Sequence, residues 1–101
     1  MIYKLRFHEL ALTEWKKLDG SVQKPLKKKL GERLENPRVP SASLSGLADC
    51  YKIKLRGVGY RLVYRVEDDV LFVTVIAVGK REKNQVYQAA QGRMKACLRR
   101  I

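Results

Sequence analysis

The sequence lacks long apolar runs and closely spaced cysteines, the features typical of membrane-spanning proteins and of zinc or redox sites. None of its apolar runs approaches the roughly 20 residues that cross a bilayer, and no apolar leader segment follows a basic start. We therefore expect a cytoplasmic protein. The two cysteines, Cys50 and Cys97, stand far apart rather than in the close pairs that bind zinc or carry redox chemistry, so we expect two ordinary thiols.

Carboxylates are also scarce. The 101 residues include 10 Asp and Glu against 22 Lys and Arg, which gives a formal net charge of +12. This excess favours a polyanionic partner, nucleic acid first, with an acidic protein or an anionic membrane surface as alternatives. Asp68 and Asp69 fall in a turn and Glu82 is distant from them, so no carboxylate cluster predicts a metal site. No cofactor motif is present either.

The spacing of apolar residues predicts a single α+β domain over residues 1–101. Alternation of apolar and polar residues predicts strands, and apolar residues three or four positions apart predict helices. Short turns join the last three strands, so we expect a small antiparallel four-stranded sheet with two N-terminal helices and a C-terminal helix. In chain order the predicted elements are a strand at 2–7, helices at 8–18 and 21–36, strands at 50–55, 60–67 and 71–78, and a helix at 83–101.

Several residues have definite expected places in this fold. Ser21 should cap the second helix, which tolerates Pro25 because proline is accepted in a first turn. The strand at 71–78 is almost entirely apolar, as expected of a strand buried on both faces, so we place it at the centre of the sheet. The first strand should face the core with Tyr3, Leu5 and Phe7.

Basic side chains gather on one face of the predicted sheet. Successive residues of a strand point to opposite faces, so Lys52 and Lys54 share a face while the apolar residues beside them face the core. A tight hairpin brings Arg61 of the next strand towards these lysines. Arg81 follows the central strand and Tyr87 lies near the start of the last helix, so both should overhang the same surface. The prediction is a cationic patch with an aromatic rim.

The residues alone leave two interpretations of this patch open, a solvated face and a phosphate-binding surface. Like charges opposed across strands destabilise a sheet by on the order of tenths of a kcal/mol each. A ligand that neutralises them, such as a phosphate backbone, is therefore the favoured interpretation. The same two interpretations apply to Lys27, Lys28 and Lys29 on the second helix, and the sequence does not decide between them.

Cleavage of RNA is a chemistry that such a patch can carry. His8 is the only histidine, which excludes the histidine pair that often cleaves RNA, and His8 itself is expected to start the first helix. RNA supplies its own nucleophile, the 2′-hydroxyl. A protein therefore need only accept that proton, stabilise the phosphorane and protonate the leaving oxygen, which lysines and arginines can do without a metal.

Two long stretches, DCYKIKLRGVGYRLVYRVEDD and VTVIAVGKREKNQVY, resemble the RelE toxins of bacterial toxin–antitoxin modules. The stretches ALTEWKKLDGSVQKPLKKKL and LENPR are similar as well, so the resemblance covers almost the whole chain. It implies the same fold and an endoribonuclease that cuts messenger RNA in the ribosomal A site, leaving 2′,3′-cyclic phosphate and 5′-hydroxyl ends without metal or cofactor. The implied partners are the 70S ribosome, a RelB-like antitoxin that covers the same face, and operator DNA through the toxin–antitoxin complex.

The resemblance also implies roles for individual residues. Lys54, sharing the task with Lys52, is the implied general base, and Arg61 supports the phosphorane. Arg81 is implied to stabilise charge and to donate a proton, and Tyr87 to stack on a base. We expect further contacts with RNA or the ribosome from other basic residues, namely Lys27, Lys28, Lys29, Arg65, Lys80 and Lys83.

Two alternatives remain open. ParE-type toxins share the fold family but act on DNA gyrase and lack this set of active-site cations, so the intact set argues against that alternative. A non-catalytic module that binds RNA or the ribosome would need charge alone, and salt-sensitive binding without product would favour it. One departure from the family pattern is Ser45, where relatives can carry a basic residue before the glycine that is Gly46 here.

Overall fold

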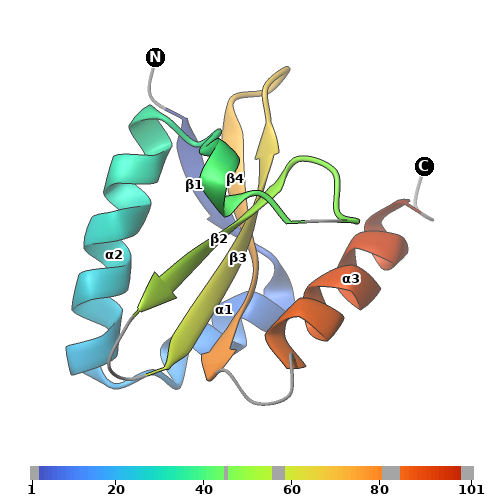
Figure 1. Ribbon diagram of the computed structural model, residues 1–101. Helices are drawn as coiled ribbons and strands as arrows, with labels where there is room; N and C mark the ends of the chain where they lie inside the picture. Colours follow the sequence, from blue (N-terminus) through green and yellow to red (C-terminus); the bar gives the residue numbers. More distant parts are fainter. Residues whose placement is uncertain (1–2, 45, 56–58, 81–84, 99–101) are drawn as a thin grey trace.

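A four-stranded sheet forms the centre of the protein, with helices on both faces (Figure 1). The computed structural model describes residues 3–44, 46–55, 59–80 and 85–98, and in the last segment it describes the side chains of Val86 and residues 88–93. The helices α1 (Glu9–Lys16) and α2 (Gly20–Glu35) pack on one face, and α3 (Gln85–Leu98) packs on the other. The predicted α+β architecture, with its helices in this chain order, is confirmed.

The strands follow the order β1-β4-β3-β2 across the sheet. Their bounds are Lys4–Phe7 for β1, Cys50–Leu55 for β2, Tyr60–Glu67 for β3 and Phe72–Lys80 for β4. β2, β3 and β4 pair antiparallel through short connections, as expected, and β4 lies inside the sheet. β1 instead pairs parallel with β4, because the helices and two strands that separate them in the chain remove the constraint of a hairpin.

Two hydrophobic clusters divide the sheet by face. On β2, Tyr51, Ile53 and Leu55 pack with α1 and α2, whereas Cys50 packs beneath α3, which confirms the alternation expected for this strand. Tyr3 and Phe7 also pack against the first cluster. The expectation for Leu5 is wrong, since this residue is 37% exposed. β1 is a short edge strand, so its middle is only partly covered.

The two N-terminal helices begin differently from each other. His8 caps α1 as predicted, because its Nδ1 accepts a hydrogen bond from the Leu10 amide at 3.2 Å. The expectation that Ser21 caps α2 is wrong. Asp19 is the N-cap, and the Ser21 hydroxyl donates to the Asp19 carboxylate at 2.8 Å. Pro25 consequently lies inside α2, beyond its first turn.

A β-bulge and an ion pair fix the part of β4 that extends beyond β1. Val63 pairs with Ala77 and Tyr64 with Val75, so Ile76 is the extra residue. The Ile76 carbonyl accepts from Arg93 Nη1 of α3 at 2.7 Å. Arg93 also pairs with Glu14 of α1, through Nη1 at 2.8 Å and Nη2 at 3.1 Å. These contacts hold α3 and α1 to the sheet.

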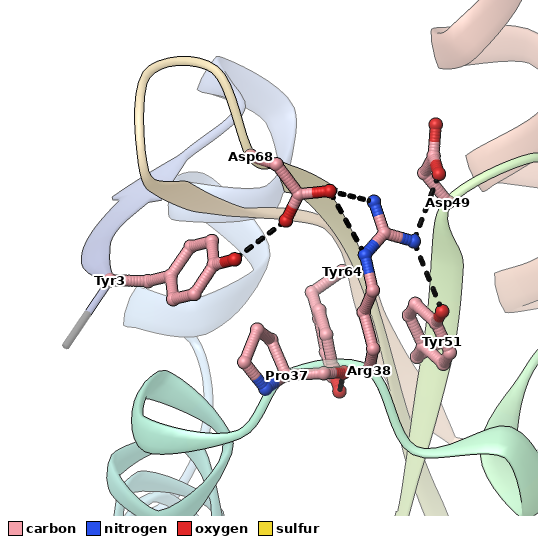
Figure 2. Close-up of polar contacts among 7 residues, drawn as sticks. All are labelled: Tyr3, Pro37, Arg38, Asp49, Tyr51, Tyr64 and Asp68. Atoms are coloured by element: carbon pink, nitrogen blue, oxygen red, sulfur yellow. Dashed lines mark hydrogen bonds and ion pairs between the residues drawn. The ribbon is translucent and has the colours of Figure 1, made fainter. Parts of the chain in front are cut away.

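A second polar cluster joins the segments that precede β1 and β2 and the segment that follows β3 (Figure 2). Arg38, just after α2, donates through Nη1 to Asp49 at 3.0 Å and to the Tyr51 hydroxyl at 3.2 Å, and through Nε and Nη2 to Asp68. The Tyr3 hydroxyl donates to the other oxygen of Asp68 at 2.6 Å. Hydrogen bonds from Arg38 and then Tyr3 hold the pKa of Asp68 below its usual range. The cluster fixes the long connection that leads into β2.

Candidate functional site

Three of the predicted catalytic residues lie together where β2 pairs with β3. Lys54 is the register partner of Arg61, and Lys52, two residues away on β2, is opposite Val63. Val63 packs in the cluster beneath α3, so by strand alternation the three cations share the α3 face of the sheet. The hairpin register expected from the sequence is therefore confirmed. Charge of one sign is concentrated on two adjacent strands.

Arg61 is the most unusual member of this group. Arg61 is only 9% exposed. It takes part in none of the five ion pairs found in the described part of the chain. On its other side Arg61 is the register partner of Gly79 on β4. A Cβ at Gly79 would lie 3.4 Å from Val86 Cγ2, an ordinary van der Waals contact, so α3 packs close to this end of the sheet. A buried cation without a carboxylate partner is costly unless a ligand supplies the counter-charge.

Some of the predicted catalytic and RNA-binding residues cannot be placed, because they lie outside the residues that the structure describes. Arg81 and Lys83 lie outside the described residues. Tyr87 falls in the first turn of α3, but its side chain is also outside the described part. Lys80 is exposed at the end of β4, where its Nζ lies 5.9 Å from the centroid of the Tyr60 ring. Its position is beyond Arg61 along the sheet rather than beside the two lysines.

Arg65 shares the face of Arg61 but lies at the other end of β3. Its Nη1 is 3.5 Å from Glu67 Oε1, and its Nε is buried with no hydrogen-bond partner among the described residues. Its register partner is Cys50 on β2. Burial raises the pKa of the Cys50 thiol to about 11, against a smaller opposing effect of the Arg65 charge. Cys50 is a free thiol, as expected.

An open groove runs along the outer edge of β2, next to the two lysines. Its volume is about 330 Å³, and the residues that line it come from α2, the short 3₁₀ helix Pro40–Ala42 and β2. Arg33 was not among the residues predicted from the sequence, and it lies one helical turn after Lys29 on α2. That four-residue spacing is the signal that could have placed both on one side of the helix. The lining residues are Lys29, Arg33, Ser41, Ala42, Lys52 and Lys54.

The other predicted RNA-binding lysines of α2 lie outside the groove. Lys27 and Lys28 are exposed on α2 and do not line the groove. In the described parts of the chain, no three His, Cys, Asp or Glu residues come together as metal ligands would. No described helix is both long and apolar enough to cross a membrane.

Comparison with known proteins finds relatives along most of the chain. Residues 5–85 match a family model described as the ParE toxin of type II toxin–antitoxin systems, parDE. The chain is 55% identical over 94 residues to the mRNA interferase toxin RelE of Escherichia coli K12, covering 93% of this chain and 99% of that protein. An mRNA interferase RelE from Shigella flexneri matches equally well.

Solved structures give the same relationship. A mutant of E. coli toxin RelE in which two arginines are replaced by alanine has been solved in the free state. It superposes on this chain with a TM-score of 0.87 and 54% identity, over 93% of this chain and 99% of that one. The toxin in the intact E. coli RelBE toxin–antitoxin complex gives a TM-score of 0.78 and 57% identity, over 80% of this chain and 99% of that one.

Proposed function

This chain belongs to the RelE family of toxins of type II toxin–antitoxin systems, and on that premise we propose that it is an endoribonuclease that cuts messenger RNA on the ribosome. Cutting at the A-site codon stops translation. The RelE relatives, which match this chain over nearly their full length, are mRNA interferases by name. We propose that cleavage depends on the ribosome, because ribosomal RNA holds the codon in position.

The observation that carries this proposal is the buried Arg61 beside Lys54. A solvated basic face has no need of an arginine that is only 9% exposed and that no described carboxylate pairs with. A transition state in which negative charge builds up on phosphate oxygens supplies the missing counter-charge at the moment it is needed. The arrangement therefore supports stabilisation of a phosphorane rather than binding alone.

The proposed reaction is an attack within the RNA itself. Lys54, assisted by Lys52, accepts the proton of the 2′-hydroxyl, and the 2′-oxygen forms a bond to the adjacent phosphorus. Arg61 stabilises the charge of the resulting phosphorane. The bond from phosphorus to the 5′-oxygen then breaks, and that oxygen takes a proton, for which Arg81 is the proposed donor. The products are a 2′,3′-cyclic phosphate and a 5′-hydroxyl end. Tyr87 is the proposed stacking partner of a base.

A messenger with one 2′-deoxy nucleotide tests this mechanism. Replacing the nucleotide 5′ to the mapped cut on a programmed ribosome removes the nucleophile, so cleavage at that bond should disappear while binding persists. Lys54→Ala should reduce cleavage of the unmodified messenger by about a hundredfold or more. Lys24→Ala, which removes an exposed lysine of α2 outside the groove, is the matched control. Cleavage of the deoxy messenger at the same bond would refute attack by the 2′-hydroxyl.

The proposed function also implies a protein partner and a cellular location. The E. coli RelE toxin has been solved in complex with RelB and with a RelB peptide. We therefore assign this chain a RelB-like antitoxin and, through that complex, operator DNA. Because the ribosome is its proposed target, the proposed location is the cytoplasm.

Inhibition of gyrase is the second candidate, because the matching family model takes its description from the ParE toxin. A supercoiling assay with purified gyrase distinguishes the two functions. We expect no inhibition by this protein at concentrations that cut messenger on ribosomes. Inhibition that survives Lys54→Ala would favour the ParE-like function instead.

A further inference from the structure

Two of the cations that line the groove beside β2 are held by hydrogen bonds to the backbone of that strand. The carbonyls of Lys52 and Lys54 lie two residues apart on the edge strand, about 6.6 Å along it. Arg33 and Lys29 lie four residues apart on α2, about 6.0 Å along the helix. These repeats match closely enough for Arg33 Nη1 to donate to the Lys52 carbonyl and Lys29 Nζ to donate to the Lys54 carbonyl, both at 3.3 Å. The helix thereby presents two positive charges along the strand that carries the two lysines.

Arg33 is anchored a second time, from below. Its Nη1 donates to the Tyr64 hydroxyl at 2.9 Å, and that hydroxyl donates to the Pro37 carbonyl at 2.6 Å. Tyr64 is fully buried, so this chain of hydrogen bonds is rigid. All the hydrogen bonds of Arg33 within the described residues use Nη1. The guanidinium is therefore held by one nitrogen while it lines the groove.

We propose that this groove binds a backbone phosphate of the RNA strand being cut, next to the scissile phosphate, with Arg33 as its main ligand and Lys29 as a second. The inference rests on the proposed function and adds a substrate subsite to it. Four of the six lining residues are cationic, none is acidic, and Ser41 adds a hydroxyl. Lys52 and Lys54 belong to both the groove and the catalytic group, so a strand whose reacting phosphate lies over Lys54 and Arg61 continues into the groove.

RNA suits this groove better than a protein segment does. A protein partner gains most of its affinity from buried aromatic and aliphatic anchors. The described lining includes one small apolar residue, Ala42, and no aromatic residue. An acidic peptide would therefore find charge but no apolar pocket, whereas a phosphodiester needs charge and hydrogen-bond donors, which a fixed guanidinium supplies.

Salt-dependent binding of an RNA that cannot be cut tests the proposal. The probe is a short single-stranded RNA with 2′-O-methyl groups throughout, bound to the free protein at several salt concentrations. Arg33→Gln should weaken binding about tenfold. It should also lower the slope of log affinity against log salt by about 0.7, the value for one phosphate contact with a single strand. Lys29→Gln should act in the same direction, and Arg33→Lys should restore most of the slope.

Two controls separate a phosphate contact from loss of charge and from loss of structure. Lys24→Gln removes the same charge from an exposed position of α2 outside the groove, and should leave the slope almost unchanged. Tyr64→Phe removes the anchor of Arg33 without changing any charge, and should weaken binding with the slope retained. The proposal is overturned if Arg33→Gln and Lys24→Gln have equal effects on affinity and slope.

A messenger with single neutral linkages identifies the strand that occupies the groove. With methylphosphonate placed one bond at a time around the A-site codon of a 2′-O-methyl messenger on a programmed ribosome, one position should abolish the difference in binding between wild type and Arg33→Gln. A difference that persists at every position would mean that ribosomal RNA fills the groove, and would overturn the substrate subsite. Neither assay requires cleavage. An inactive wild-type protein would count against the proposed function alone, and an unimportant Arg33 in an active protein against the subsite alone.

Discussion

Arg61 and Cys50 show how burial acts on single residues of the α3 face. Burial raises the pKa of the Cys50 thiol to about 11, so this residue stays neutral and behaves as part of the core. A guanidinium cannot escape its charge in this way, because arginine stays protonated in proteins. Arg61 therefore keeps a buried positive charge with no described carboxylate beside it. A charge buried in this way lowers the stability of the fold, and we expect its benefit to be the binding of an anionic ligand.

The substitution Arg61→Met tests this trade between stability and activity. Methionine fills similar space without charge, so we expect the free energy of unfolding to rise by about 1 kcal/mol. Cleavage on the ribosome should fall by about a hundredfold or more, because the phosphorane loses its fixed cation. Urea unfolding and a cleavage time course measure the two effects. A variant that is less stable and equally active would show that Arg61 is a structural residue.

At the scale of elements, two polar clusters hold the helices and connections around the sheet. The Glu14–Arg93 pair links α1, α3 and the bulge of β4, and is the principal described polar contact that holds α3 in place. The Arg38 cluster links the connections before β1, before β2 and after β3 (Figure 2). Both clusters join segments that are distant in the chain, and both leave the cationic groove free of acidic side chains.

Asp68 makes the Arg38 cluster sensitive to acid. Its pKa is lowered in the folded protein, so its contribution to stability is complete above its unfolded pKa, near 4, and is lost as the pH falls through the lower folded value. Asp68→Asn lacks that contribution. Urea midpoints for wild type should exceed those for the variant by a constant amount above about pH 5, and the gap should narrow below about pH 4. A gap that widens in acid would contradict the assignment. The effect should be small, because Asp68 is exposed.

How far the sequence predicts the structure depends on the range of the contacts involved. The bounds of β2 and β3 and the register of Lys54 with Arg61 follow from alternation and a short hairpin, which are local. The parallel partner of β1 could not be predicted, because no short connection joins it to β4. Arg33 was not predicted either, because its position also depends on contacts between segments that are distant in the chain. Its place beside Lys52 depends on how α2 packs along the sheet, which a single sequence does not specify.

At the scale of the whole molecule, the net charge of +12 is distributed unevenly. The ion pairs in the described part involve Arg6, Arg38, Arg65 and Arg93, which surround the sheet away from the groove. The cations that line the groove beside β2 are Lys29, Arg33, Lys52 and Lys54. In the proposed function, we expect the long-range field to attract the protein to RNA and the cations on β2, β3 and α2 to position the strand. Positioning matters because a misplacement of about 1 Å can cost about a hundredfold in rate.

Ribosome-dependent cleavage is tested by primer-extension mapping of messenger RNA on programmed ribosomes, with EDTA-treated free RNA alongside. Wild-type protein and Lys54→Ala are compared at equal concentration. We expect cuts at the A-site codon with wild type only, and no comparable cuts in free RNA. Binding to ribosomes without cuts by the wild-type protein would contradict this expectation and would make this chain a non-catalytic ribosome-binding protein.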